Sequence, residues 1–355
     1  MGRTLMKGNE ALALAAIRGG CTHFFGYPIT PQNEIPEFFA RELPKVGGLF
    51  LQAESEIAAV NMLYGSAAAG ARAMTSSSSP GLALMQEGIS MLAATEIPCV
   101  IVNVMRGGPG LGTIQPAQSD YFQMTRGGGN GDYRIISLAP ATVQESAEMM
   151  QEAFDLAHKY RTPVFLVSDG MLGQMMEPVE FSIPVGTKPA GDQSWVLCGH
   201  LGRRPPRTIK SLRLDPAMLE DHNLKLQEKY RRITRREARF EPYRADDAEL
   251  LFCAFGSTSR IVKNSVDDLR QKGHRAGLIR PMTLWPFPSP AFRSLPENCT
   301  SLICVEMSCG QMVDDVRLAV GGRVPVHFYG RCGGVIPEPA ELSEYAEELI
   351  AGGSV

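Results

Sequence analysis

Apolar runs that alternate with helix-like segments restrict the fold of this sequence more than any other feature. Residues 99–105, 135–138 and 164–167 are rich in Val, Ile and Leu, as strands buried on both faces are. A helix-like segment, residues 143–158, separates the last two. The other strand-like runs are residues 22–25, 49–52 and 72–75, and the other helix-like runs are 9–17, 57–69 and 81–93. This alternation predicts an α/β fold, with a mostly parallel sheet and helices on both faces.

The alternation stops between residues 182 and 245. That stretch is rich in proline and contains a charged run, residues 225–236, in which Glu228 interrupts the basic residues. We interpret the run as a solvated linker helix and not as a nucleic-acid-binding surface. Alternation then resumes, with strands expected at 250–255, 276–279 and 301–305 and helices at 258–272 and 311–320. The prediction is therefore a first α/β domain (1–181), a linker (182–245) and a smaller second α/β domain (246–355).

Composition excludes several classes of protein. The formal net charge of −3 gives no indication of a nucleic-acid or membrane partner. The most apolar stretch, residues 82–104, is interrupted by Glu87, Glu96 and Pro98, so no membrane span is expected. The first residues lack a signal-peptide pattern, and we expect a cytoplasmic location.

The eight cysteines show no C-x-x-C pair and no zinc or iron–sulfur spacing. We expect them to be buried free thiols in a reducing cytosol. If the protein takes part in redox chemistry, its electrons must therefore leave through another chain.

Four loops follow predicted parallel strands, where ligands gather in open α/β sheets. The loop at 26–31 holds Thr30 between two prolines, and the next loop leads to Glu56 at the start of a nearly uncharged helix, which we expect to be buried on most sides. The third contains four consecutive serines, residues 76–79, and the fourth begins with Arg106 and continues with glycines. Each feature alone has an ordinary explanation: a helix cap for Thr30 or a serine, a helix-dipole carboxylate for Glu56, a surface side chain for Arg106.

Chemically, these loops suit an anionic or carboxylate ligand. Hydroxyls and amides at a helix start attract anions, and an arginine is the natural partner of a carboxylate. The helix start lowers the pKa of Glu56 and apolar burial raises it, and the sequence does not decide between them. No Walker, H-E-x-x-H or G-x-S-x-G motif occurs, and the glycine-rich loop is not a dinucleotide fingerprint.

Taken together and in order, these loops resemble the alpha subunit of the 2-oxoacid:ferredoxin oxidoreductases, most closely the branched-chain, 2-ketoisovalerate-oxidising type. The segments that carry the resemblance are MKGNEALALAAIRGGC, FGYPITPQNEIPE, LQAESEIAAVN, MTSSSSPG, VNVMRGGPGLGTIQPAQSDYFQ, SDGMLGQMMEPVEF, IRPMTLWPFP and VEMSCGQMVDDVR. The resemblance implies a thiamine-diphosphate-binding fold. Residues 1–181 would be its pyrimidine-binding domain, and residues 246–355 a domain similar to the transketolase C-terminal domain.

The resemblance also implies a catalytic role for Glu56. It would hydrogen-bond the aminopyrimidine ring of thiamine diphosphate, promoting the imino tautomer that abstracts the thiazolium proton to give the ylid. Glu54 would be a neighbour and not the catalytic acid, because the residues after Glu56 fit the family pattern better.

The remaining site residues follow from the same resemblance. Thr30 and Arg106 would hold the carboxylate of the 2-oxoacid. The cofactor would also contact Tyr27, Pro28, Ile29 and Ser79.

Magnesium and iron–sulfur clusters are expected in partner subunits. A G-D-G motif followed by Asn-Asn would mark the diphosphate and Mg²⁺ site. Here Gly131-Asp132 is followed by Tyr133, no Asn-Asn pair occurs, and Asn130 has no assigned role. No metal residue is therefore predicted in this chain. We expect a beta subunit to bind the diphosphate and Mg²⁺, with gamma and ferredoxin-like delta subunits beside it.

The expected reaction converts a 2-oxoacid, CoA and oxidised ferredoxin into acyl-CoA, CO₂ and reduced ferredoxin, with chemistry that resides in the cofactor. The chain would be inactive alone. Alternatives are an alpha subunit specific for 2-oxoglutarate, a transketolase or lipoamide-dependent dehydrogenase subunit, and a non-enzymatic assembly subunit. The joint presence of Glu56, Thr30 and Arg106 argues against the last.

Overall fold

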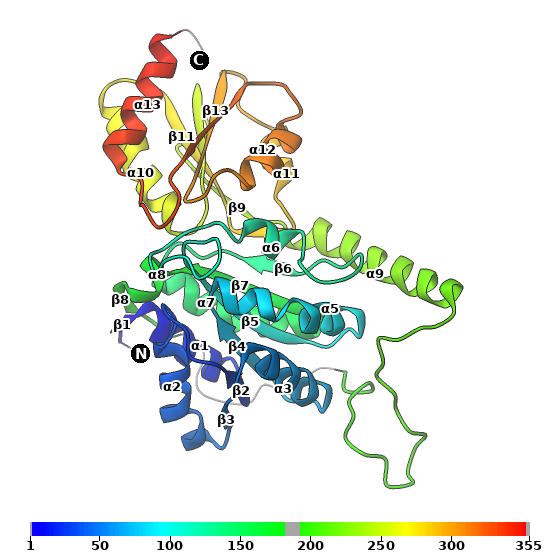
Figure 1. Cartoon of the computed structure of the whole chain (residues 1–355). Coiled ribbons are helices and arrows are strands. Elements are labelled where there is room, and N and C mark those ends of the chain that lie inside the picture. The colour runs from blue at the N-terminus through cyan, green and yellow to red at the C-terminus, as the bar shows by residue number, and fades with distance from the viewer. Residues whose placement is uncertain (1, 182–191, 353–355) are drawn as a thin grey trace.

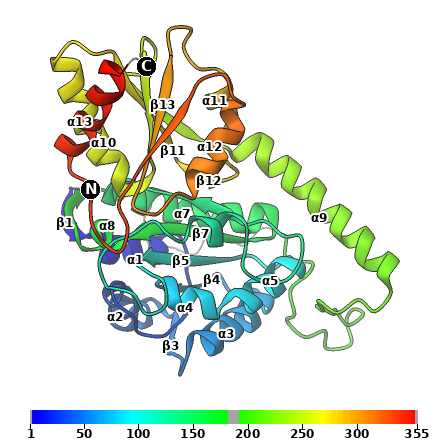
Figure 2. The ribbon, with the colours of Figure 1, turned by 45° about the horizontal axis from the view of Figure 1, so that its top comes forward.

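The computed structural model describes residues 2–181 and 192–352, and it has the predicted α/β class. Two α/β domains stack one above the other, and a long helix projects from the side between them (Figures 1 and 2). The part of the predicted linker at 182–191, with Pro184 and Pro189, lies outside the described residues.

The first domain is built on a seven-stranded sheet in the order β12-β6-β7-β5-β4-β2-β3. All neighbouring strands are parallel except β12, which runs antiparallel to β6. The central strands are completely buried, as their Val- and Ile-rich sequences predict. The strands are β2 (His23–Gly26), β3 (Leu49–Gln52), β4 (Ala73–Ser77), β5 (Cys99–Met105), β6 (Ile136–Leu138), β7 (Pro163–Asp169) and β12 (Thr283–Trp285).

Helices cover both faces of this sheet. α1, α2 and α7 pack together on one face, and α3, α4 and α5 on the other (Figure 1). A small antiparallel pair, β1 (Thr4–Lys7) and β8 (Met176–Val179), lies beside α1. The helices are α1 (Gly8–Arg18), α2 (Glu34–Glu42), α3 (Glu56–Ala68), α4 (Ser79–Leu84), α5 (Gln86–Ala94), α6 (Tyr121–Thr125), α7 (Val143–Tyr160) and α8 (Gly170–Gln174), with a 3₁₀ turn η1 (Pro44–Val46).

The second domain has a five-stranded sheet in the order β14-β13-β10-β11-β9. α10 and α13 pack together on one side of it, and α11 and α12 on the other (Figure 1). The elements are β9 (Phe240–Tyr243), β10 (Leu250–Cys253), β11 (Ala276–Pro281), β13 (Ser301–Glu306), β14 (Val326–Gly330), α10 (Gly256–Gln271), α11 (Ser289–Arg293), α12 (Met312–Val320) and α13 (Pro339–Ala351).

Two strands lie across the predicted domain limits. β9 falls within the predicted linker but belongs to the second sheet, antiparallel to β11. β12 falls within the predicted second domain but completes the sheet of the first. The limits 1–181, 182–245 and 246–355 therefore remain a prediction.

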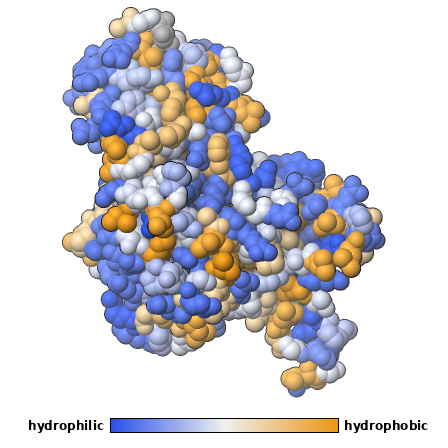
Figure 3. All heavy atoms as spheres, in the orientation of Figure 1, coloured by the Kyte–Doolittle hydropathy of each residue, from blue (hydrophilic) through white to orange (hydrophobic). Residues whose placement is uncertain are grey.

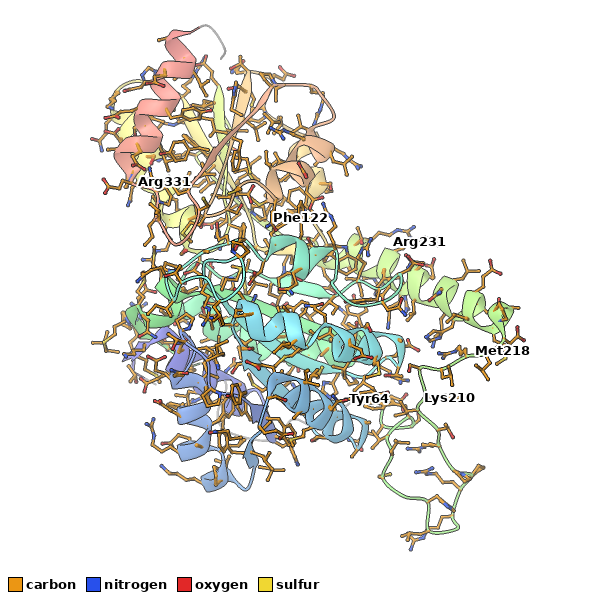
Figure 4. The ribbon with its side chains drawn as sticks, in the orientation of Figure 1. Tyr64, Phe122, Lys210, Met218, Arg231 and Arg331 are labelled. Carbon is orange, nitrogen blue, oxygen red and sulfur yellow. The ribbon has the colours of Figure 1, made fainter. Side chains whose placement is uncertain are left out.

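The predicted linker helix is α9 (Pro216–Glu237). Asp215 caps it by accepting a hydrogen bond from the amide of Ala217 (3.0 Å). Leu226, Tyr230 and Ile233 form its buried face, but its outer end stands away from the body, as Met218 shows in Figure 4. Apolar side chains gather over that end (Figure 3), and the exposed ones are Leu212, Leu214, Met218, Leu219 and Leu224.

The two domains are joined by a buried ion-pair cluster. Arg280 on β11 is only 1% exposed, and its two terminal nitrogens donate to the carboxylate of Glu145 in the first turn of α7 (2.9 and 2.7 Å). Its Nε donates to Glu241 on β9 (2.6 Å). Each of the three nitrogens of this guanidinium thus donates to a carboxylate, in a geometry that suits a buried arginine.

A second set of contacts ties residues 118–126 to the second domain. Gln118 donates to the carbonyl of Phe255 (2.9 Å) and accepts from the hydroxyl of Thr258 (2.8 Å). Asp315 accepts from the hydroxyl of Tyr121 (2.5 Å) and from both terminal nitrogens of Arg126 (2.9 Å each). Figure 4 shows Phe122, from the same segment, beneath the second domain. The side of the first domain that faces the second is therefore closed by this chain itself.

Candidate active site

The four loops singled out in the sequence lie along one edge of the first sheet. They follow β2, β3, β4 and β5, which are consecutive neighbours in the sheet and run parallel. Their carboxyl ends therefore meet at one edge, the usual ligand position in open α/β sheets.

Glu56 is buried at the start of α3. The side chain of Ser55 caps this helix by accepting from the amide of Ala58 (3.1 Å). Glu56 itself is 6% exposed, and within the described residues its carboxylate has no hydrogen bond or ion pair. Glu54 is exposed and precedes the helix. A buried carboxylate without a partner is expensive, which favours a ligand at this position.

Gly81 leaves space beside Glu56. A side-chain carbon at Gly81 would collide with the carboxylate of Glu56 and with the hydroxyl of Ser77. Only glycine therefore lets α4 approach the carboxylate this closely.

One expectation about α3 was wrong in part. Its charge-poor sequence indicated a helix buried on most sides. In the chain alone the face with Ile57 and Asn61 is exposed. Leu51 and Leu84 are also exposed, so an apolar surface adjoins Glu56.

Thr30 and Arg106 are brought together, as the sequence predicts for one site. The Nη1 of Arg106 donates to the carbonyl of Thr30 (2.9 Å), and its Nη2 donates to the carbonyl of Leu111 (3.0 Å). The Nε–H is buried and has no partner in the part of the chain described. The guanidinium is thus fixed in place and still has donor capacity. The hydroxyl of Thr30 accepts a long hydrogen bond from Asn33 (3.4 Å).

The loop before Thr30 is partly open to solvent. Tyr27 and Pro28 are exposed and Ile29 is half-buried. Their predicted contact with a cofactor is not tested by the structure and stays a prediction.

Ser79 lies at the same edge, in a network that the sequence did not reveal. Its hydroxyl accepts from the amide of Arg106 (3.0 Å) and lies 2.6 Å from Oδ2 of Asp120. The same Asp120 oxygen accepts from the amide of Asn103 (2.9 Å). Burial raises the pKa of Asp120, although the hydrogen bonds from Ser79 and Asn103 oppose that effect. The hydroxyl of Ser79 is thus already used within the chain, and its predicted cofactor contact remains untested.

The other serines of this loop point into the protein. Thr75, Ser76, Ser77 and Ser78 are completely buried. Ser76 donates to the side chain of Gln32 (2.5 Å). The hydroxyl of Ser76 thus supports the loop after β2, a role that the sequence pattern did not indicate.

The cysteine prediction was partly wrong. All eight are free, as expected, but Cys198, Cys309 and Cys332 are exposed. The last two lie in loops beyond strand ends, where no apolar sequence context favours burial.

Residues 2–181 and 192–352 contain no group of three or more His, Cys, Asp or Glu side chains placed to hold a metal ion. No helix in these ranges is long and apolar enough to cross a membrane.

Two family models match the chain. Residues 14–210 match the thiamine-diphosphate-binding domain of pyruvate flavodoxin/ferredoxin oxidoreductase, and residues 248–342 match core domain II of pyruvate:ferredoxin oxidoreductase.

Curated relatives match the whole chain. The ketoisovalerate oxidoreductase subunit VorB of Methanothermobacter thermautotrophicus is 48% identical over 355 residues, 100% of this chain and 99% of that protein. The 2-oxoglutarate synthase subunit KorA of Methanocaldococcus jannaschii is 35% identical, over 95% of this chain and 97% of that protein.

Solved structures are similar as well. The 2-oxoglutarate:ferredoxin oxidoreductase of Magnetococcus marinus, determined with 2-oxoglutarate, coenzyme A and succinyl-CoA, superposes with a TM-score of 0.88 at 28% identity. This chain is covered to 99% and that chain to 66%. A split-gene transketolase, an inactive beta4 tetramer, superposes over 98% of both chains with a TM-score of 0.60 at 12% identity, which is a likeness of fold alone.

Proposed function

Because the chain belongs to the 2-oxoacid:ferredoxin oxidoreductases, as a subunit of the alpha type, we propose that it supplies the pyrimidine-side half of a shared active site. The reaction would convert a branched-chain 2-oxoacid, CoA and oxidised ferredoxin into acyl-CoA, CO₂ and reduced ferredoxin. The observation that carries the proposal is the buried, unpartnered carboxylate of Glu56 at the ligand edge of the sheet.

Glu56 fits the role of acceptor for a ring N–H of the aminopyrimidine. Its carboxylate is positioned by the start of α3 and faces the space that Gly81 leaves, and the residue is only 6% exposed. When bound, thiamine diphosphate supplies the electron sink that decarboxylation requires. Glu56 would hold a proton shared with the ring in the low-polarity surroundings in which such a hydrogen bond is strongest.

Arg106 and Thr30 would orient the substrate carboxylate. Two of the nitrogens of Arg106 are held by the carbonyls of Thr30 and Leu111, which leaves the buried Nε–H and the remaining terminal hydrogens to bind an anion. Holding the carboxylate at a fixed angle aligns the 2-oxo carbon for reaction.

The loop after Arg106 supports a branched-chain substrate over a dicarboxylic one. No lysine or arginine occurs between residues 107 and 125, so this loop offers no cation for a second carboxylate. It presents instead Leu111, 81% exposed, and Ile114, 55% exposed. The identity to ketoisovalerate oxidoreductase subunits, 48% against 35% for a 2-oxoglutarate synthase subunit, supports the same choice.

A beta subunit would cover the edge of the sheet that carries Glu56. The exposed apolar residues Leu51, Ile57 and Leu84 adjoin the site and suit burial against another chain. That subunit would bind the diphosphate and Mg²⁺. Iron–sulfur clusters would lie there or in a ferredoxin-like delta subunit, with a gamma subunit completing the complex, because this sequence has no cluster-binding cysteine spacing.

The test is hydrogen–deuterium exchange at the thiazolium C2 of cofactor bound to the assembled complex. Glu56→Gln should retain the fold and much of the cofactor affinity but slow the exchange by at least about tenfold, because an amide is a much weaker acceptor than a carboxylate. Glu54→Gln is the matched control and should leave the exchange unchanged, since Glu54 is exposed and precedes α3. Equal exchange rates in the wild type and Glu56→Gln would remove the catalytic role and leave Glu56 as a helix-dipole carboxylate.

A further inference from the structure

Cys309 and Cys332 follow neighbouring strands of the second sheet. β13 and β14 are parallel and paired in register up to Glu306 and Gly330. Cys309 comes three residues after the first and Cys332 two residues after the second. Both side chains are exposed and both thiols are free.

The two loops leave the sheet side by side. The amide of Arg331 donates to the carbonyl of Glu306 (3.2 Å). A side-chain carbon at Gly330 would lie 2.5 Å from the carbonyl oxygen of Ser308. In Figure 4, Arg331 lies at the end of the second domain nearest to the first. These contacts bring the segments that hold the two cysteines together beyond the strands.

The two thiols are near enough to influence each other: the Cys332 thiol raises the pKa of the Cys309 thiol. Cys198, the third exposed cysteine, is elsewhere, on the segment before α9, where its sulfur accepts from Arg204 (3.7 Å).

The loop after Cys332 packs on the glycine-rich loop that begins at Arg106. A side-chain carbon at Gly107 would lie 3.0 Å from the carbonyl carbon of Gly333, and one at Gly334 would lie 2.5 Å from Cβ of Gln115. Both approaches depend on the absence of side chains. The position of residues 332–334 therefore limits the space open to the loop that carries Leu111 and Ile114.

The loop after Cys309 touches the other end of the same segment. Gln311 donates to the carbonyl of Ser119 (2.6 Å) and accepts from the amide of Phe122 (2.8 Å). The two cysteines thus belong to the two loops of the second domain that hold residues 107–122 from either side.

We propose that Cys309 and Cys332 form a reversible disulfide, and that this modification site acts on the loop that follows Arg106. The oxidant is a low-molecular-weight disulfide. Two S–H bonds break and one S–S bond forms between the cysteines, while the small disulfide takes up two electrons and two protons and leaves as two thiols. Exchange of this kind requires accessible thiols, which both cysteines are.

The cross-link would fix the loops after β13 and β14 to each other. Residues 333 and 334 could then no longer shift independently of Gln311, and the glycine-rich loop would lose that freedom of movement. If this loop admits the substrate, as the proposed function has it, oxidation should weaken binding of the 2-oxoacid. This consequence rests on the proposed function, whereas disulfide formation does not.

The first experiment tests the chemistry on the full chain alone. The reduced protein is treated with oxidised glutathione under anaerobic conditions, free thiols are alkylated, and peptides are analysed by mass spectrometry. A peptide pair linked through Cys309 and Cys332, lost again after treatment with a dithiol reductant, is the expected result. In the variant Cys309→Ser, Cys332 should instead retain a glutathione adduct, and Cys198→Ser should leave the linked pair unchanged. Separate glutathione adducts on Cys309 and Cys332 in the wild type would overturn the proposal.

The second experiment tests the effect on the site in the assembled complex. Oxidation should raise the KM for the 2-oxoacid by roughly 2- to 30-fold, the range typical of coupling between neighbouring elements. The double variant Cys309→Ser, Cys332→Ser should show no such change and should match the reduced wild type without oxidant. An unchanged KM in the fully oxidised wild type would overturn the coupling to the loop, whatever substrate the enzyme proves to use.

Discussion

Two sides of the first domain differ in how many of their polar side chains find hydrogen-bond partners within this chain. On the side that faces the second domain, Arg280, Gln118 and Asp315 have their hydrogen bonds made across the interface. At the edge that carries the candidate site, the carboxylate of Glu56, a residue only 6% exposed, and the buried Nε–H of Arg106 have no partners in the described chain.

The difference indicates what each side is for. A polar network that is complete within one chain contributes to stability and to a fixed arrangement of the domains. Buried polar groups that remain unpaired reduce stability, and they persist at sites where a ligand pairs with them. Mutations on the first side should therefore change unfolding, and mutations on the second should change catalysis.

The largest effect on unfolding is expected for Arg280→Ala. It leaves the carboxylates of Glu145 and Glu241 without their buried cation and should lower the free energy of unfolding by about 3 kcal/mol. Arg275→Ala is the control, because Arg275 pairs with Glu249 at the exposed surface. It should lose no more than about 1 kcal/mol. Urea denaturation of both variants measures the difference, and equal losses would show that the interface cluster contributes no more than a surface pair.

Arg106→Ala should affect catalysis and spare stability. Removing one partner of a desolvated arginine–carboxylate contact costs at least about 2 kcal/mol, so kcat/KM in the assembled complex should fall by about 30-fold or more. Bound cofactor should remain at the wild-type level. Arg126→Ala, on the side that faces the second domain, should change kcat/KM by no more than about twofold, because Arg126 pairs with Asp315 of the second domain and makes no hydrogen bond or ion pair with the four loops. Loss of cofactor with normal kinetics after reconstitution would contradict the role of Arg106.

A smaller effect on stability and on KM is expected for Asp120, which links Ser79 at the site edge to Asn103 on β5. Asp120→Ala deprives the Ser79 hydroxyl and the Asn103 amide of their acceptor and should cost about 1–2 kcal/mol in stability, with a raised KM for the 2-oxoacid. Asp120→Asn should restore most of both, because a single oxygen, Oδ2, accepts from both groups and an amide oxygen can take its place. If Asp120→Asn were as impaired as Asp120→Ala, the negative charge and not the hydrogen bonds would be what matters.

The wild type and Asp120→Asn should also differ in how their stability depends on pH. Burial raises the pKa of Asp120 above its ordinary value of 3.8, so the folded protein holds this proton more tightly than the unfolded chain does. Ionisation of Asp120 therefore lowers stability as pH rises through the window between the unfolded and folded pKa values. Relative to Asp120→Asn, the wild type should lose stability as pH rises through this window. Unfolding measured from pH 3 to 7 tests the sign.

The sequence predicted the elements whose own residues determine them. β5 begins and ends where expected, because a continuous apolar run of this length is typical of a strand buried on both faces. β3 also has the expected bounds, although it is an edge strand that is largely exposed in the chain alone. β12 and β14 were not predicted. β12 is only three residues long and β14 is a half-exposed edge strand, so neither has a strong pattern.

The position of the candidate loops was predictable where one loop follows one strand. Arg106 directly follows a predicted strand, Thr30 and Glu56 follow theirs within about five residues, and the parallel sheet brings these loops to one edge. Asp120 was not predictable, because its partner Ser79 is 41 residues away and nothing local marks the pair. The proximity of Cys309 and Cys332 likewise depends on the register of β13 with β14.

The position of β12 has a consequence for how the chain acquires its structure during synthesis. β6 is an edge strand of the first sheet until Thr283–Trp285 has been made and pairs with it. The first domain thus leaves the ribosome with an open edge at β6, in addition to the edge at β3, more than a hundred residues before the segment that closes the β6 edge. Open strand edges pair readily with other chains. A fragment that ends at residue 245 would keep this edge, so it should aggregate where the full-length chain does not.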